Sequence, residues 1–76
     1  MTHVDLDCRG LPCPRPIIEL ARAMARVGLG ETVTVTADDP AARADVQAWC
    51  RMRGQEYVGE QPAPDGVPTF AVRRVS

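Results

Sequence analysis

Three cysteines, Cys8, Cys13 and Cys50, are the residues of this chain that could act as nucleophiles. All nine basic residues are arginine, so a lysine Schiff base is impossible. With Ser76 as the only serine and His3 as the only histidine, a Ser-His-Asp site is also excluded. A zinc site would require the three cysteines and His3 to converge. We therefore expect thiol chemistry and no metal.

The stretch from Cys8 to Pro16 is the strongest candidate for the site of that chemistry. Proline is tolerated in the first turn of a helix, so Pro14 and Pro16 predict that a helix begins here. A proline also keeps the preceding residue out of the helical region, which makes Cys13 the expected N-cap. A thiol beside the positive end of a helix dipole has a lowered pKa. We expect Arg9 and Arg15 either to lower the pKa of Cys13 further, to meet an acidic partner, or to be simply solvated.

The hydrophobic periodicity predicts six elements. In order, they are a strand over 3–8, a helix from about Pro14 to Val27, a strand over 31–37, a second helix, a strand over 56–60 and a strand over 69–75. The second helix has Asp39 as N-cap, Pro40 at its first position and Gly54 at its end, and a loop over 62–68 with a turn at Asp65-Gly66 separates the last two strands. The predicted buried stripe of the first helix is Ile17, Leu20, Ala21 and Met24, and that of the second is Ala42, Val46, Trp49 and Cys50. Right-handed crossovers then place both helices on one face of the sheet. We predict a single domain over 1–76, of class α+β: a two-layer sandwich with a four-stranded mixed sheet and a final hairpin.

Composition and charge restrict the classes of partner. The net charge is −1, so no basic excess is available to neutralise phosphates, and direct binding of nucleic acid is not expected. No apolar run approaches ~18 residues, so no membrane span is expected. The N-terminal residues lack the features of a signal peptide. An odd number of cysteines with no leader indicates reduced thiols in the cytoplasm rather than a disulfide framework.

The sequence from Leu6 to Pro16 resembles the Cys-Pro-X-Pro signature of the TusA/SirA sulfur-carrier family. Gly30-Glu31-Thr32 and the run from Ala37 to Pro40 are also similar to that family, as is Cys50 on the second helix. The resemblance extends from about Val4 to Arg74. The motif lies between the first strand and the first helix, where the family carries it.

The resemblance implies a cytoplasmic sulfurtransferase of the carrier type that accepts sulfane sulfur as a persulfide on Cys13. Pro14, Arg15, Pro16, Arg9 and Gly10 would be supporting residues of the motif. The donors would be cysteine desulfurases or rhodanese-type proteins. The acceptors would be sulfur-relay proteins for tRNA thiolation, for cofactor biosynthesis or for sulfur metabolism. No metal or organic cofactor is implied.

Cys8 departs from the family pattern, which often has alanine or another small residue there. It is either a core-facing strand residue or a resolving thiol that forms a disulfide with Cys13. The second possibility makes a thiol–disulfide redox switch the main alternative function, and a non-catalytic interaction domain is a third. Trp49 and Cys50 are expected to pack in the core, and Asp38 and Asp39 to act as capping residues.

Overall fold

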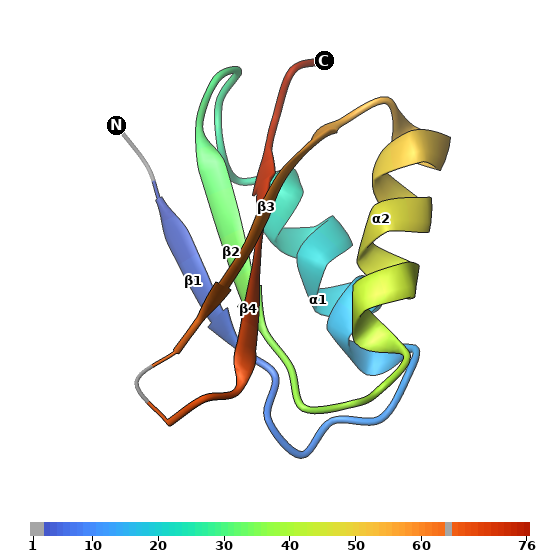
Figure 1. Cartoon of the computed structure of the whole chain (residues 1–76). Coiled ribbons are helices and arrows are strands. Elements are labelled where there is room, and N and C mark those ends of the chain that lie inside the picture. The colour runs from blue at the N-terminus through green and yellow to red at the C-terminus, as the bar shows by residue number, and fades with distance from the viewer. Residues whose placement is uncertain (1–2, 64) are drawn as a thin grey trace.

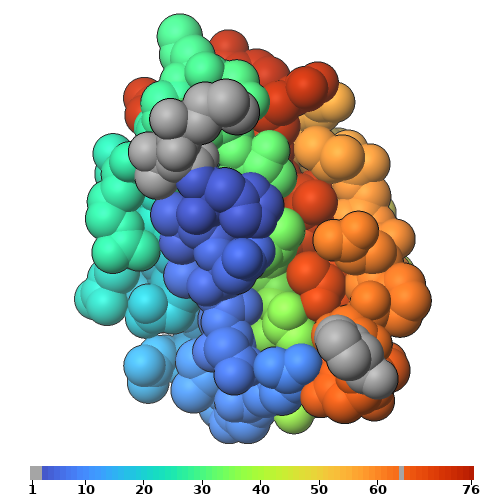
Figure 2. Space-filling view, turned by 90° about the vertical axis from the view of Figure 1, so that its left-hand side faces the viewer, coloured from blue at the N-terminus to red at the C-terminus, as the bar shows by residue number. Residues whose placement is uncertain are grey.

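The protein, described by a computed structural model over residues 3–63 and 65–76, is a two-layer α+β sandwich. Its elements in chain order are β1 Val4–Asp7, α1 Arg15–Met24, β2 Thr32–Thr36, α2 Ala42–Arg53, β3 Glu56–Pro62 and β4 Pro68–Arg73. Both helices cover one face of the four-stranded sheet, as predicted (Figure 1). Strands are visible at the surface in Figure 2, where neither helix lies over them. Within the described residues, no helix is long and apolar enough to span a bilayer.

The sheet has the strand order β1-β2-β4-β3. β1 and β2 are parallel, with Val4 opposite Val33, whereas β4 is antiparallel to both of its neighbours. β3 and β4 form the predicted hairpin, but the strands are longer at the turn than expected, and Pro62 is opposite Pro68. The turn at Asp65-Gly66 is present, with the Gly66 N–H donating to the Ala63 carbonyl at 2.8 Å. Pro64 of the predicted loop lies outside the described residues.

The core lies between the helices and the sheet. Every position predicted for the buried stripe of α2 is buried: Ala42, Val46, Trp49 and Cys50. On α1, Leu20 and Met24 are buried as predicted, but Ile17 and Ala21 are only half-buried. Pro16 and Ala23 are buried instead, so the inward face of α1 is rotated from the predicted stripe.

Both helices are shorter than predicted. α1 begins at Arg15 rather than at Pro14 and ends at Met24 rather than at Val27. α2 begins at Ala42, two residues after the predicted start, because Asp39 organises a turn ahead of the helix and not its first turn. Gly54 ends α2 as predicted, in the left-handed conformation with φ +70°.

Candidate functional site

Three connections meet at one end of the sheet, the lower end in Figure 1. Because β1 and β2 are parallel, the loops that follow them leave the same edge of the sheet. The first is the β1–α1 loop, which carries the cysteine motif, and the second is the β2–α2 loop. The β3–β4 turn joins them there. The sheet topology therefore brings together segments that are far apart in the sequence.

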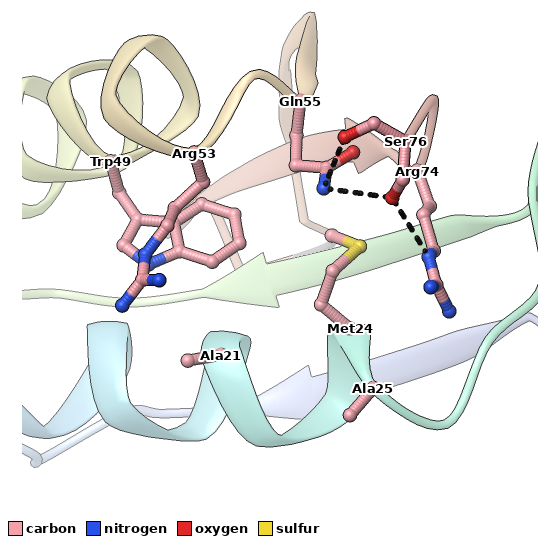
Figure 3. A pocket seen from close by; sticks show the side chains of 8 residues that line it. All are labelled: Ala21, Met24, Ala25, Trp49, Arg53, Gln55, Arg74 and Ser76. Atoms are coloured by element: carbon pink, nitrogen blue, oxygen red, sulfur yellow. Dashed lines mark hydrogen bonds between the residues drawn. The ribbon is translucent and has the colours of Figure 1, made fainter.

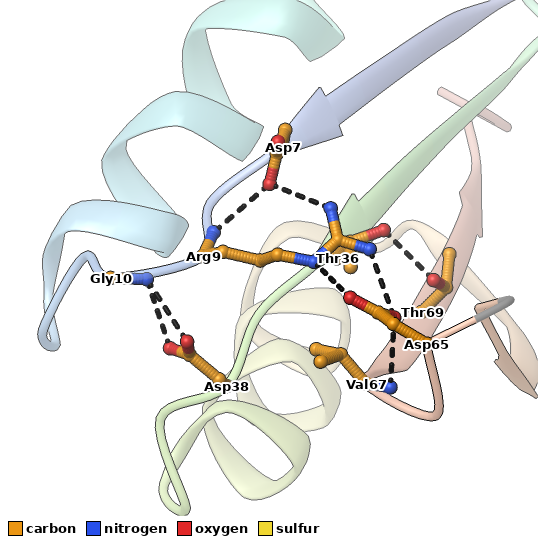
Figure 4. A network of polar contacts seen from close by, with 8 residues as sticks. All are labelled: Asp7, Arg9, Gly10, Thr36, Asp38, Asp65, Val67 and Thr69. Carbon is orange, nitrogen blue, oxygen red and sulfur yellow. Dashed lines mark hydrogen bonds and ion pairs between the residues drawn. The ribbon is translucent and has the colours of Figure 1, made fainter.

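The β1–α1 loop begins with a tight turn. The Leu11 N–H donates to the Cys8 carbonyl at 3.2 Å, and Gly10 occupies the third position with φ +77°, which a side chain would strain. The Gly10 N–H also donates to both carboxylate oxygens of Asp38, at 3.1 Å each (Figure 4). Asp38 therefore acts as a tie between two loops and not as the helix cap that we expected.

Arg9 fixes the same loop to the hairpin. Its guanidinium donates to the two oxygens of Asp65, at 2.9 and 3.1 Å, and to Asp7 at 3.0 Å (Figure 4). With these donors already engaged, Arg9 does not contribute to the pKa of Cys13. Of the roles expected for Arg9, tuning of the thiol is therefore wrong, because two carboxylates nearer to the guanidinium bind it.

Asp39 holds the backbone of Cys13. One carboxylate oxygen accepts the Cys13 N–H at 2.8 Å, and the other accepts the Ala41 N–H at 2.8 Å. These hydrogen bonds lower the pKa of the Asp39 carboxyl, and the bond from Ala41 has the larger effect. The candidate cysteine is thus tied to the turn that precedes α2.

Cys13 is not the N-cap that the sequence predicted. The N-cap is Pro14, whose carbonyl accepts the N–H groups of Ile17 and Ile18 at 3.1 and 3.0 Å. The N–H of Arg15, the first residue of α1, donates to the Pro12 carbonyl at 2.9 Å. The cysteine lies one residue before Pro14, outside the helix. The hydrogen-bond partner of its sulfur is a side chain of the other helix.

That partner is Asp45, in the first turn of α2. The exposed Cys13 thiol donates to its Oδ2 atom, with 2.8 Å between sulfur and oxygen. This hydrogen bond, then burial and the charges of Asp45 and Asp39, raises the pKa of Cys13. The predicted lowering is therefore wrong: the nearest charges are carboxylates, and neither Arg9 nor Arg15 offsets them. In the isolated chain, the thiol is the favoured form.

The Cys13 sulfur lies in a shallow apolar groove of about 250 Å³ between the two helices. Its other lining residues are Pro14, Ile17, Asp45, Ala48, Trp49 and Met52. Met52 is 78% exposed, which is unusual for a large apolar side chain. Asp45 and Met52 were not among the site residues predicted from the sequence. Their spacing could have indicated that they lie together, because positions 45, 48, 49 and 52 follow the helical period and form one stripe on α2.

The remaining motif residues have distinct positions. Pro14 lines the groove, Pro16 is buried in the core, and Arg15 is exposed at the start of α1. Burial raises the pKa of Cys8, and the charge of Arg15 opposes that rise in part; Arg15 is not among the causes of the pKa shift of Cys13. Its expected effect on the candidate thiol is therefore not found.

The other two cysteines are core residues. Cys8 is 1% exposed and Cys50 is 2% exposed, and burial is the main cause that raises the pKa of each thiol. The core interpretation of both is confirmed. A Cys8–Cys13 disulfide would require Cys8 to leave the core, where it packs at the end of β1. The structure gives the redox alternative no support.

A second hollow, of about 370 Å³, lies at the C-terminal ends of both helices (Figure 3). Arg53, Arg74 and Gln55 contribute its polar groups, and Met24 and Trp49 contribute apolar surface. Ser76 closes one side by accepting hydrogen bonds from Gln55 at 3.3 Å and Arg74 at 3.1 Å. No cysteine lines this hollow, so we assign the candidate chemistry to the groove around Cys13.

The fold and the site define a small α+β protein that presents one exposed thiol on a loop held by side-chain hydrogen bonds. The chain belongs to the TusA sulfurtransferase family, whose model matches residues 4–74. A protein of Archaeoglobus fulgidus with the name "Putative sulfur carrier protein" is 40% identical over 71 residues, which are 93% of this chain and 92% of that protein. A protein of Neisseria meningitidis serogroup A, named in the same way, is 37% identical over 73 residues, or 96% and 97% of the two chains.

The fold has a solved counterpart in a SirA-like protein from Desulfitobacterium hafniense. The TM-score is 0.82 at 26% sequence identity, and the match covers 96% of this chain and 99% of the other. The family and these relatives support a role as a sulfur carrier. They also support contacts with proteins that give and receive sulfur.

Proposed function

We propose that this protein carries sulfane sulfur as a persulfide on Cys13. The observation that supports the assignment is exposure: of the three cysteines, all within the described residues, Cys13 alone is exposed. It is also the cysteine of the Cys-Pro-X-Pro motif. A shallow groove offers little room to enclose a substrate, so selectivity would come from the docking of partner proteins.

The reaction is a thiol exchange. The Cys13 sulfur attacks the terminal sulfur of a persulfide on the donor, and the donor cysteine leaves as a thiolate. Cys13 then carries the persulfide, and a second exchange of the same kind passes its terminal sulfur to an acceptor. Both steps conserve sulfur and electrons, so neither needs a metal or an organic cofactor.

The partners that we propose are a cysteine desulfurase or a rhodanese-type protein as donor, and a downstream relay protein as acceptor. Sulfur so delivered would serve tRNA thiolation, cofactor biosynthesis or sulfur metabolism. Three thiols without disulfide bonds suit a reducing compartment, which for this proposal is the cytoplasm.

The experiment is intact-protein mass spectrometry after incubation with a cysteine desulfurase and cysteine, and in parallel with a rhodanese and thiosulfate. We expect the parent chain to gain one sulfur, and Cys13→Ser to gain none while its circular dichroism stays unchanged. The matched control is Cys8→Ala, which removes a buried thiol and should still be loaded. Loading of Cys13→Ser, or no loading of the parent by either donor, would contradict the proposal.

A further inference from the structure

The contact between Cys13 and Asp45 joins two elements that are separated by 32 positions in the sequence. Asp45 comes from the first turn of α2, and Cys13 is fixed from the other side by the bond of its N–H to Asp39. The sulfur is therefore held against a carboxylate by the tertiary structure, not by a flexible local contact. Such an arrangement affects how easily the thiol loses its proton.

The charges around this thiol have one sign. Asp45 and Asp39 both disfavour the thiolate, and no cation of the described residues offsets them. Arg9 already binds Asp7 and Asp65. Across 3–63 and 65–76, no arginine forms an ion pair with Asp45 or Asp39, although the chain has other exposed ion pairs. The site is thus an acidic spot beside an apolar groove.

This arrangement is a poor resting state for a nucleophile, because the thiolate is the form that attacks a persulfide. It is a good resting state for a thiol that must not react before its partner arrives. Among the described residues, no arginine forms an ion pair with Asp45, the carboxylate that the thiol contacts. A donor that docks over the groove can supply the positive charge that would favour the thiolate.

We infer that Asp45 keeps Cys13 in its protonated form until a cationic side chain of the sulfur donor pairs with the Asp45 carboxylate and frees the sulfur to react. This inference rests on the proposed function. It identifies Asp45 as the residue that controls the reactivity of Cys13, and it states the charge of the partner group that touches it. Lysine or arginine beside the donor's persulfide would meet this requirement.

The loading step balances in this scheme. When the cation pairs with Asp45, the S–H bond of Cys13 breaks and its proton goes to water. An S–S bond then forms between the Cys13 sulfur and the terminal sulfur of the donor persulfide. The older S–S bond breaks, its electron pair stays on the donor cysteine, and the resulting thiolate takes up a proton. No oxidant or reductant is consumed.

The first test uses the isolated protein and requires no sulfur donor. The rate of alkylation of Cys13 by iodoacetamide is measured against pH by peptide mapping for the parent, Asp45→Asn and Asp45→Lys. We expect the pH–rate curve to move to lower pH in the order parent, Asn, Lys. At pH 7 the rate of Asp45→Asn should rise about two- to fivefold, the size of effect typical of exposed charge contacts.

The matched control is Glu60→Gln, which also removes one carboxylate but one that contacts Arg43 instead of Cys13. Its pH–rate curve should coincide with that of the parent. If both Asp45 variants fold normally and react no faster than the parent, Asp45 does not hold the proton and the inference is wrong. If one of the two Asp45 variants fails to fold, the other still tests the inference.

The second test measures loading by a cysteine desulfurase and cysteine at increasing salt. Between roughly 0.1 and 1 M, the Debye length falls from about 10 to about 3 Å, so a contact between a cation and Asp45 weakens. We expect the loading rate of the parent to fall steeply with salt and that of Asp45→Asn to fall less. If the loading rates of the parent and of Asp45→Asn fall equally with salt, the inference of a cationic partner group is wrong. If the parent is never loaded, the proposed function is wrong, and so is the inferred partner group. The alkylation experiment still tests the role of Asp45, because it requires no sulfur donor.

Discussion

Gly10→Ala tests whether the turn ahead of Cys13 positions the thiol. Gly10 has φ +77°, and a Cβ atom built there would meet nothing within 4 Å. The cost is therefore conformational and not steric. An L-residue in the left-handed region costs about 1–2 kcal/mol. A domain of this size has only ~3–5 kcal/mol of net stability, so the variant stays mostly folded.

Gly30→Ala is the matched control. Gly30 has φ +84° and equally open surroundings, but it precedes β2 and so lies at the opposite end of that strand from the site. Both variants should lose about 1–2 kcal/mol in urea unfolding, because both incur the same backbone strain. Only Gly10→Ala should slow the loading of Cys13, because relaxation of the turn moves the residues that follow it.

Two results would refute this reasoning. If Gly10→Ala is as stable as the parent, the turn does not hold Gly10 in the left-handed conformation. If the two variants are equally destabilised and load at equal rates, the turn stabilises the fold but does not position the thiol. D-alanine at position 10, introduced by chemical synthesis, should restore both stability and loading because its preferred φ is positive.

Two further predictions concern stability. The pKa of Asp39 is lower in the folded state than in the unfolded chain, so the stability it contributes is present above the unfolded value of about 3.9 and is lost as the pH falls below it. Asp39→Asn should therefore be less stable than the parent in urea at pH 6, and this difference should shrink at pH 3; a constant difference would contradict the hydrogen-bonded carboxylate. Leu20→Ala, at a fully buried position of α1, should lower the free energy of unfolding by about 2–5 kcal/mol and unfold much of the protein. Leu29, in contrast, is 68% exposed, so Leu29→Ala should lower that free energy by less than about 0.5 kcal/mol in the same urea titration.

Local patterns were enough to predict the elements and to single out one candidate cysteine. The alternation over 31–37 predicts β2, and the helical spacing of Val46, Trp49 and Cys50 predicts the inward face of α2. These predictions hold because burial depends on a period that neighbouring residues alone define. Cys13 was identified in the same way, from the prolines beside it and from the lack of any alternative nucleophile. Its role as the persulfide acceptor stays a proposal.

The errors about the electrostatics of the site arose where a residue has partners distant in the sequence. Cys13 was expected to be a helix N-cap with a lowered pKa, but Pro14 caps α1 and Asp45 accepts the thiol hydrogen. An effect on the thiol was one of the three roles considered for Arg9, but Asp65, 56 positions later, binds its guanidinium. Sequence spacing near the motif contains no information about either carboxylate.

The sequence by itself determined the class of fold and singled out Cys13 as the candidate residue, because composition and short-range periodicity are enough to predict both. Only the tertiary structure decided the electrostatic state of the site. The strand order β1-β2-β4-β3 places the β2–α2 loop and the first turn of α2 beside the cysteine loop, and Asp39 and Asp45 reach Cys13 from there. Coulomb interactions depend on distance in space and not along the chain, so the sign of the pKa shift of Cys13 followed from the fold.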